Sequence, residues 1–412
     1  MSNSEINPSK KLIPVSVVGA RNIPGCRVPL MRCVRCGLPE TYETIEFDSD
    51  GVCSICKQHD YKVEQIDWDA RKKELDDLIK SHRDRFNYDA IVPFSGGKDS
   101  TWTLLYLMKE YKIRPLVVQF DHGFMRPNLL ENNEKTFRKL GVAVHTFRPN
   151  WKVVKRVMLE SLISKGDFCW HCHTGIFSYP MWVAIKESTP LVIWGEPSSE
   201  YTSYYDYRDN EVESVDETRF NRFTNLGITA EDMLGMIKTD SKFDSRDLLP
   251  FQYPPRRDLA KLGYRSVCLG SFIPWNARTQ SVAIKQELDW NGDEVEGMPE
   301  GLYDHEKIEC WMQGCRDYIK FLKRGYSRVS QMTALDVRNG VMKKDEADLL
   351  VEQFDGRKPA SLALLLEYLD LSEDEFNTIV KKTVVAPHEP DFLSIQPAKT
   401  PKDFGRWYRE KK

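Results

Sequence analysis

Residues 95–100 read Ser-Gly-Gly-Lys-Asp-Ser and have the clearest potential for chemistry in this sequence. Two adjacent glycines, Gly96 and Gly97, let the backbone approach a phosphate closely and adopt conformations that other residues resist. Backbone N–H groups in such a turn, and at the start of a helix, converge on an anion. Lys98 adds a positive charge, and the flanking Ser95 and Ser100 add hydroxyl donors. The segment is therefore predicted to bind the phosphates of a nucleotide, with Asp99 beside them.

The position of this loop supports that prediction, because it follows an apolar strand and begins a helix. It is not a Walker loop, which places four residues between its glycines before the lysine. In this setting the SGGKDS segment resembles the PP-loop of ATP pyrophosphatases, which cleave ATP between the α and β phosphates. The alternative is a glycine-rich turn without a function. We expect the loop to be exposed, so that substitutions of Lys98 or Asp99 would leave the fold intact.

Two further carboxylates follow predicted strands. Asp121 comes after the strand at residues 115–120, and Glu196 comes after the strand at residues 191–194. Ligands of an open parallel sheet bind beyond the carboxyl ends of its strands. Asp121 is therefore expected to face the nucleotide, or else to be an ordinary turn aspartate. Glu196 is a candidate for sugar binding or proton transfer, with a surface carboxylate as the alternative.

Six of the ten cysteines form three Cys-x-x-Cys pairs. Two of these pairs, Cys33/Cys36 and Cys53/Cys56, have the spacing of a zinc ribbon, in which four thiolates surround Zn²⁺. The alternatives are disulfides, which a reducing compartment disfavours, or packed thiols that bind no metal. A structural zinc site is therefore predicted at residues 31–60.

The third cysteine pair lies in Cys169-Trp170-His171-Cys172-His173. Cys169, Cys172 and His173 are interpreted either as ligands of a second metal or as the lining of a substrate pocket without a metal. Cys268 is a possible third ligand if the pair holds an iron–sulfur cluster. Attachment of a c-type haem is disfavoured because no export signal accompanies the motif.

Composition sets the broad class of the protein. The chain has 412 residues, of which 41% are hydrophobic, and a net charge of −3. This composition is typical of a folded globular protein and lacks the basic excess of a dedicated nucleic-acid binder. No apolar run approaches the length of a membrane span. We therefore expect a cytoplasmic protein without membrane insertion or a nucleic-acid partner.

Alternating short apolar runs and longer periodic segments are expected to position these residues. Strands are predicted at residues 90–94, 115–120, 142–147 and 191–194, and helices at 68–82, 100–110, 130–140 and 151–165. Such alternation is typical of an α/β fold with a parallel sheet. Further helices are predicted at 303–324, 344–354, 361–369 and 373–382, the last with a capping box formed by Ser372 and Glu375.

Five parts of the chain follow from this pattern. We predict an N-terminal arm (1–30), a zinc-binding module with four cysteines (31–60), a PP-loop ATP pyrophosphatase domain (61–301), a helical C-terminal region (302–385) and an irregular tail (386–412).

The order of these motifs resembles that of the N-acetyl sugar amidotransferases of surface-polysaccharide and nonulosonate sugar pathways. The resemblance covers most of residues 31–383. Its landmarks are residues 31–36, 50–56, 95–100, 168–173, 192–196, 273–275, 316–320 and 323–326.

The resemblance implies an AMP-forming carbon–nitrogen ligase of lipopolysaccharide or O-antigen biosynthesis. Such an enzyme adenylates the acetamido carbonyl of a nucleotide-linked N-acetyl sugar, and ammonia then displaces AMP to give an acetamidino sugar. ATP, Mg²⁺ and Zn²⁺ are the implied cofactors. Lys98, Asp99 and Glu196 would act in catalysis, with Asp99 or Asp121 as a magnesium ligand. Substrate phosphates are expected at Arg316, Lys323, Arg324 and Arg328, or else these residues form a solvated helix face.

The source of ammonia is expected to be a separate glutaminase with an ammonia-channelling subunit, like those of histidine biosynthesis. None of the ten cysteines lies in a Gly-x-Cys-x-Gly elbow, and the chain begins Met-Ser rather than with a cysteine. Two alternatives remain. A tRNA sulfurtransferase would use Cys169, Cys172 and Cys268, and a non-catalytic nucleotide-binding protein would use the same fold without turnover.

Overall fold

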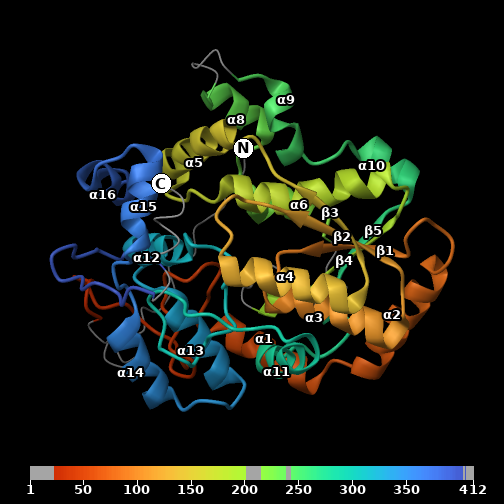
Figure 1. The fold of residues 1–412 in the computed structure, drawn as a ribbon. Helices are drawn as coiled ribbons and strands as arrows, with labels where there is room; N and C mark the ends of the chain where they lie inside the picture. Colours follow the sequence, from red (N-terminus) through yellow and green to blue (C-terminus); the bar gives the residue numbers. More distant parts are fainter. Residues whose placement is uncertain (1–22, 201–214, 238–242, 402–403, 405–412) are drawn as a thin grey trace, which may run out of the picture.

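The centre of the computed structural model, which describes residues 23–200, 215–237, 243–401 and 404, is a five-stranded parallel sheet (Figure 1). Its strands are β1 (Ala90–Phe94), β2 (Pro115–Phe120), β3 (Ala143–Phe147), β4 (Leu191–Trp194) and β5 (Arg265–Cys268). They lie in the order β3-β2-β1-β4-β5, so the winding changes direction between β1 and β4. Open parallel sheets bind ligands at this switch point, beyond the carboxyl ends of the two strands.

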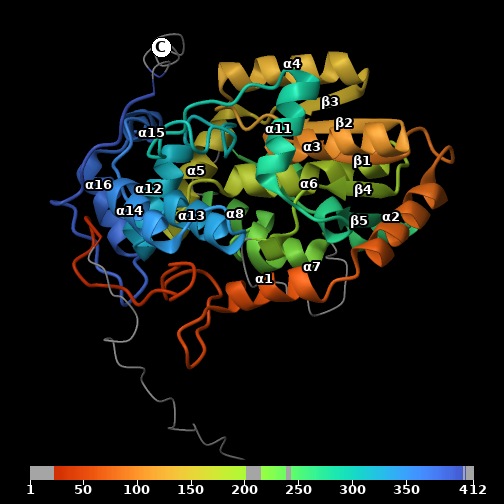
Figure 2. The same ribbon diagram turned by 90° about the horizontal axis from the view of Figure 1, so that it is seen from below.

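Helices cover both faces of the sheet, because successive strand residues point to opposite sides. Val92 and Phe94 of β1 pack with α2 (Trp68–His82) and α3 (Lys98–Tyr106), whereas Ile91 packs with α6 (Trp170–Lys186). On the α3 side lie α4 (Pro127–Leu140) and α11 (Ala277–Leu288), and α10 (Arg256–Leu262) packs beside α6 (Figure 2). This doubly covered sheet confirms the predicted α/β class.

Most predicted elements of the sheet region are confirmed, with small shifts at their ends. The helix expected at residues 100–110 is α3 followed by a π-helical turn, Leu107–Tyr111, and the helix at 151–165 is α5 (Trp151–Lys165). The elements of the sheet region that were missed include α6, β5, α10 and α11. Helix α6 is buried on several sides and contains Pro180, so it shows no amphipathic pattern. Strand β5 is only four residues long and begins with an exposed arginine.

Short elements connect β4 to α11. They are the 3₁₀ turns Ser198–Glu200, Leu249–Phe251 and Leu269–Ser271, the π turn Phe220–Thr224, and the helices α7 (Glu217–Arg219), α8 (Ala230–Ile237) and α9 (Ser245–Leu248). Within the described ranges, no helix is both long enough and apolar enough to cross a membrane.

The C-terminal region forms a group of helices at one side of the sheet domain (Figures 1 and 2). These are α12 (Gln313–Arg324), α13 (Arg328–Arg338), α14 (Lys344–Phe354), α15 (Ser361–Leu369) and α16 (Glu373–Lys381), and α16 has the predicted capping box. The prediction of a helix from residue 303 is wrong for residues 303–312. That segment is irregular, because its side chains contact the sheet domain instead of forming a helical face, and α13 was not predicted.

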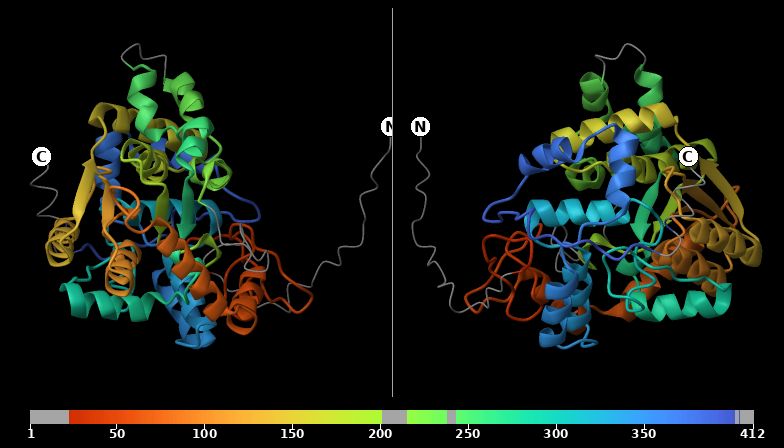
Figure 3. Two further views of the ribbon diagram at one scale, coloured as in Figure 1. Left: turned by 90° about the vertical axis from the view of Figure 1, so that its right-hand side faces the viewer. Right: turned by 60° about the vertical axis from the view of Figure 1, so that its left-hand side comes forward.

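The four-cysteine module lies against both the sheet domain and the C-terminal helices (Figure 3). It consists of short bridges, Arg32↔Pro39 and Phe47↔Cys53, and the helix α1 (Ser54–Glu64). Its apolar residues pack with Tyr326 and with Ala334 of α13. The predicted arm at residues 1–30 lies mostly outside the described residues. The tail from 386 to 401 contains no helix or strand, as predicted.

Candidate active site at the switch point of the sheet

The glycine loop joins β1 to α3 and is held in shape by its own serines. The N–H groups of Ser95 and Gly96 donate to Ser100 Oγ at 3.2 and 3.1 Å, and the Gly97 N–H donates to Ser95 Oγ at 3.3 Å. Gly96 has a φ of +89°, and a Cβ there would overlap the Asn133 side chain. A Cβ on Gly97 would overlap the Glu309 carboxylate. The observed loop conformation therefore requires glycine at both positions. No side chain hydrogen-bonds to the backbone N–H groups at the start of α3 as a cap.

Lys98 does not lie on an exposed loop, so that expectation is wrong. Its side chain is 2% exposed, and its ammonium lies 2.7 Å from Asp99 Oδ2 and 2.8 Å from Glu306 Oε2. Glu306 in turn pairs with Arg328 at 3.0 Å, and Arg328 pairs with Asp317 at 3.1 Å. The first residues of α3 are thus tied to the C-terminal region by a chain of buried opposite charges.

Residues 304–309, which read Asp-His-Glu-Lys-Ile-Glu, supply three groups that the sequence analysis missed. Glu306 pairs with Lys98, Lys307 Nζ lies 3.7 Å from Glu196 Oε1, and Glu309 accepts a hydrogen bond from Ser95 Oγ at 3.4 Å. Three acids and two bases within six residues are the signal that could have indicated them. A charged run of this kind is usually a solvated face, and the sequence analysis assigned the segment only to a helix.

Glu196 and Asp99 differ in protonation because their surroundings differ. Burial and the neighbouring Asp99 carboxylate raise the pKa of Glu196 to about 8. Burial opposes ionisation of Asp99, but the Lys98 ammonium lowers its pKa below the ordinary value. At neutral pH the proton therefore resides on Glu196, while Asp99 is ionised. Paired carboxyl groups with separated pKa values are typical of acid–base sites.

Asp121 follows β2 as predicted, but both of its oxygens have partners. The Gly123 N–H donates to Oδ1 at 2.8 Å, and Arg148 Nε donates to Oδ2 at 2.5 Å. The first contact is that of an aspartate stabilising its own turn. The geometry therefore favours the turn aspartate over a nucleotide ligand.

The four N-terminal cysteines come together as predicted. Their sulfurs lie within 4.8 Å of one another, with Cys33–Cys56 at 3.9 Å and Cys36–Cys53 at 3.7 Å, and all four residues are buried. Ligands at about 2.3 Å around a tetrahedral zinc lie about 3.8 Å apart. The donor set and its geometry therefore fit a structural metal ion.

The same module reaches the active-site region through α1. Gln58 Nε2 donates to the Ser199 carbonyl at 2.9 Å, and Lys62 forms a buried ion pair with Glu200. Ser199 and Glu200 belong to the turn that follows Glu196. The four-cysteine module therefore supports the loop that carries a candidate catalytic residue.

The second cysteine pair does not form a comparable cluster. Cys169 is the N-cap of α6, Cys172 and His173 lie in its first turn, and burial raises the pKa of both thiols. Cys169 packs with α5 and α12, whereas Cys268 packs with the far part of α6. In the part of the chain that the structure describes, only the N-terminal cysteines bring three or more metal-ligating side chains together. This arrangement favours the pocket-lining interpretation.

Arg316, Lys323 and Arg324 line one recess on α12, so the structure brings three of the four candidates for substrate phosphates together. The fourth, Arg328, is buried in ion pairs with Glu306 and Asp317 and does not line the recess. Lys320 lines the same recess and was not predicted as a site residue. The sequence signal was its spacing, since Lys320 lies four residues after Arg316 on the same face of the helix.

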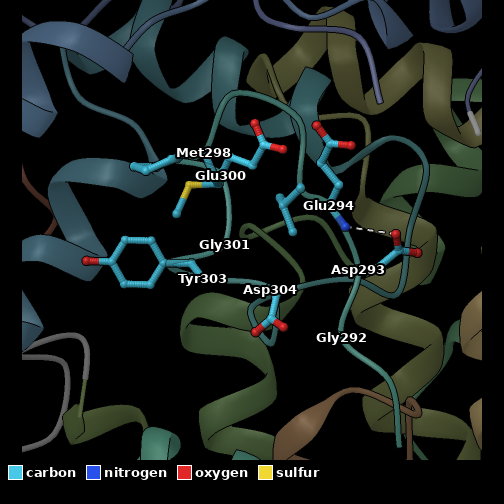
Figure 4. A pocket seen from close by; sticks show the side chains of 10 residues that line it. Gly292, Asp293, Glu294, Met298, Glu300, Gly301, Tyr303 and Asp304 are labelled. Atoms are coloured by element: carbon cyan, nitrogen blue, oxygen red, sulfur yellow. Dashed lines mark hydrogen bonds between the residues drawn. The ribbon is translucent and has the colours of Figure 1, made fainter. Parts of the chain in front are cut away.

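Another hollow is lined by residues 292–304 and carries four carboxylates (Figure 4). Asp293 pairs with Arg126, Asp304 with Lys285, and Glu294 and Glu300 with Lys399. Because each acid already has a cation, the hollow offers no reactive group.

A family comparison bears on the C-terminal helical region. Residues 304–399 match the family model of the C-terminal domain of WbpG-like lipopolysaccharide biosynthesis proteins, which supports the resemblance to the N-acetyl sugar amidotransferases. The match begins at the charged segment that contacts the glycine loop. An uncharacterized protein of Methanocaldococcus jannaschii is 29% identical over 104 residues, which cover 25% of this chain and only 37% of that relative.

Among solved structures, the chain is similar to the tRNA thiolase NcsA of Methanococcus maripaludis, described with its 4Fe-4S cluster. The match has 13% identity and a TM-score of 0.27, and covers 78% of this chain and 88% of that one. A similarity at this level carries no argument about fold or reaction.

Proposed function

From the WbpG-like match and the site that it helps to form, we propose that this chain is the synthetase subunit of an ATP-dependent amidotransferase. It converts the acetamido group of a nucleotide-linked N-acetyl sugar into an acetamidino group, releasing AMP and pyrophosphate. The observation that carries the proposal is the contact between Glu306, at the start of the matched domain, and Lys98 of the glycine loop at 2.8 Å. This contact supports the proposal because it brings the matched domain to the loop that we propose binds the nucleotide.

The reaction requires activation because an amide carbon is a poor electrophile. The amide oxygen attacks the α phosphorus of ATP, the bond from that phosphorus to the bridging oxygen breaks, and pyrophosphate leaves. Ammonia then adds to the carbon of the O-adenylyl imidate and loses a proton, and AMP departs with the former amide oxygen. The glycine loop and the start of α3 supply N–H groups to the phosphates.

Three residues have separate parts in this scheme. Lys98 compensates negative charge at the loop while Asp99 and Glu306 hold its ammonium in place. Glu196 holds a proton at neutral pH and transfers it between the substrate and the site. Asp99 stays ionised beside the Lys98 ammonium and shares a side-chain hydrogen bond with the Glu196 carboxyl.

Two metal ions belong to the proposal. Asp99, with Glu309 close to the loop, would hold Mg²⁺, which supplies charge neutralisation for the phosphates. Cys33, Cys36, Cys53 and Cys56 would hold Zn²⁺, which stabilises the module. Carboxylate oxygens suit the first ion and thiolate sulfurs the second.

Ammonia comes from partner proteins in this proposal. None of the ten cysteines lies in a glutaminase elbow, and four of them are gathered in the N-terminal cluster. A separate glutaminase and an ammonia-channelling subunit, similar to those of histidine biosynthesis, would deliver it. We predict that the purified chain uses ammonium but not glutamine, and that adding both partners restores glutamine use. Glutamine hydrolysis by the chain alone would contradict this.

The tRNA sulfurtransferase alternative gains no support from the cysteine geometry. Cys169 and Cys172 pack in one cluster of apolar side chains, whereas Cys268, the third cysteine that it requires, packs in another. A non-catalytic nucleotide-binding protein is the remaining alternative, and turnover distinguishes it directly.

The test is an incubation with ATP, Mg²⁺, ammonium and a panel of nucleotide-linked diacetamido sugars. We expect AMP, pyrophosphate and a sugar in which NH has replaced oxygen, as detected by mass spectrometry. Asp99→Asn should lose this activity, whereas Asp77→Asn, on the exposed face of α2, should retain it. ATP consumption at a rate that does not depend on the sugar, or the formation of ADP, would refute the proposal.

A further inference from the structure

A recess on α12 carries more positive than negative side chains. Arg316, Lys320, Lys323 and Arg324 face it from the helix, and Asp167 and Glu43 are the acids that line it. Asp167 comes from the segment between α5 and α6, and Glu43 from the four-cysteine module. Its four cations exceed its two acids, so an anion would be attracted to it.

Two of the four cations have structural partners. Lys323 Nζ donates to the carbonyls of Lys165 and Gly166 at 2.7 and 3.3 Å, which satisfies the C-terminal end of α5. Arg324 Nη1 donates to the Thr41 carbonyl at 2.7 Å and its Nε lies 3.6 Å from Glu43. These two side chains join α12 to its neighbours and are therefore not free to hold a ligand.

The other two cations, Arg316 and Lys320, are held less firmly. Arg316 Nε is buried and makes no hydrogen bond. The Lys320 ammonium lies over the Tyr326 ring, 5.8 Å from its centroid, and forms no ion pair or hydrogen bond with the residues that the structure describes. A buried donor without an acceptor destabilises the folded protein, and a ligand oxygen that accepts its hydrogen bond would remove this cost. Burial lowers the pKa of Lys320 to about 8; the Glu43 carboxylate opposes this shift, and the Arg316 guanidinium adds to it.

The recess and the proposed active site are formed by neighbouring segments of the chain. Helix α12 follows the charged segment that contacts the glycine loop. His173, in the first turn of α6, lies within electrostatic range of both Arg316 in the recess and Lys307 beside Glu196. One substrate could therefore contact both regions if its anionic part lies at α12 and its acetamido group at the loop.

We propose that Arg316 and Lys320 bind the diphosphate of the nucleotide-linked sugar, and that Lys323 and Arg324 have structural roles. This inference rests on the proposed function for the identity of the ligand. A planar guanidinium with a neighbouring ammonium suits phosphoryl oxygens, since the fork fixes geometry and the point charge adds attraction.

The test measures binding without turnover. Inorganic pyrophosphate and UDP-N-acetylglucosamine are titrated calorimetrically into the full chain, with the glycine loop saturated by α,β-methylene-ATP, whose own binding is measured first. We expect one site for each probe in the unaltered protein and at least about a tenfold loss of affinity in R316Q/K320Q. The control K73Q/K109Q removes two exposed lysines and should bind as the unaltered protein does.

Three results separate the possibilities. Unchanged affinity in R316Q/K320Q, with zinc content and circular dichroism intact, would overturn the inference. Binding of pyrophosphate without binding of UDP-N-acetylglucosamine would overturn it in favour of a site for the free anion. Failure of α,β-methylene-ATP to bind, or absence of an amidine product, would count against the proposed function and leave this binding result standing.

Discussion

The four-cysteine module and the glycine-loop site both bury ionisable groups, but they balance charge differently. The module gathers four like groups, whose sulfurs lie within 4.8 Å, and the Arg338 guanidinium is the neighbouring positive charge. One guanidinium does not balance four thiolates. The loop site alternates signs from Lys98 to Glu306 to Arg328 to Asp317, each pair within 3.1 Å. The module therefore needs an external cation, whereas the loop site neutralises itself from its own residues. Removal of the metal should destabilise the four-cysteine module, whereas loss of one charged side chain should destabilise the glycine-loop site.

Loss of one charge from the loop site should have the largest effect. In Lys98→Met, Glu306 remains buried without one of its partners, so we expect a loss of about 3–5 kcal/mol in the free energy of unfolding. Turnover should fall by at least about a hundredfold, because charge on the leaving phosphates is no longer compensated. Urea unfolding and pyrophosphate release measure the two effects.

The double variant K98M/E306Q is the control for this prediction. It removes one of the two carboxylates that Lys98→Met leaves uncompensated, since Asp99 also loses the ammonium, so stability should partly return while turnover stays low. Full stability in Lys98→Met alone would show that the chain of charges does not balance as described.

Removal of one thiolate from the module should have the next largest effect. We expect Cys36→Ser to lose the metal, of which the unaltered chain holds about one zinc ion, and to lower the thermal midpoint. Cys172→Ser, in the second cysteine pair, should keep its zinc. Elemental analysis checks both, and a chelator-free preparation without zinc would remove the assignment.

The proton on Glu196 should make stability depend on pH in a predictable direction. A carboxyl whose pKa rises from 4.5 to about 8 on folding stabilises the protein below pH 4.5, and this contribution is lost as the pH rises toward 8. Relative to the unaltered protein, Glu196→Gln should gain up to about 1.4 kcal/mol of unfolding free energy per pH unit in that window. Chemical unfolding at several pH values measures this gain, and parallel profiles would contradict the pKa shift.

The contact between the two regions should have the smallest effect. Gln58→Ala removes the hydrogen bond from α1 to the Ser199 carbonyl, which we expect to cost about 1 kcal/mol and a few-fold in turnover. Zinc content should not change. Gln65→Ala, at the exposed end of α1, is the matched control, and equal turnover in the two variants would show that the module does not support the Glu196 loop.

Residue spacing predicted what is local in the chain. The two Cys-x-x-Cys pairs, the loop between β1 and α3, and the strands β1 to β4 were found because short-range pattern determines them. Glu306, Lys307 and Glu309 were missed because their role depends on contacts between segments far apart in the chain, which no local pattern contains. The same long-range contacts bury Lys98, so the expectation of an exposed loop was wrong.

The product that receives the amide oxygen tests the proposed adenylation of the acetamido group most directly. A nucleotide-linked diacetamido sugar carrying a heavy oxygen isotope in its acetamido carbonyls is incubated with the chain, ATP, Mg²⁺ and ammonium. Attack of that oxygen on the α phosphorus predicts one heavy oxygen in the AMP released and none in pyrophosphate. Label in pyrophosphate or inorganic phosphate, or unlabelled AMP formed together with an amidine, would contradict it.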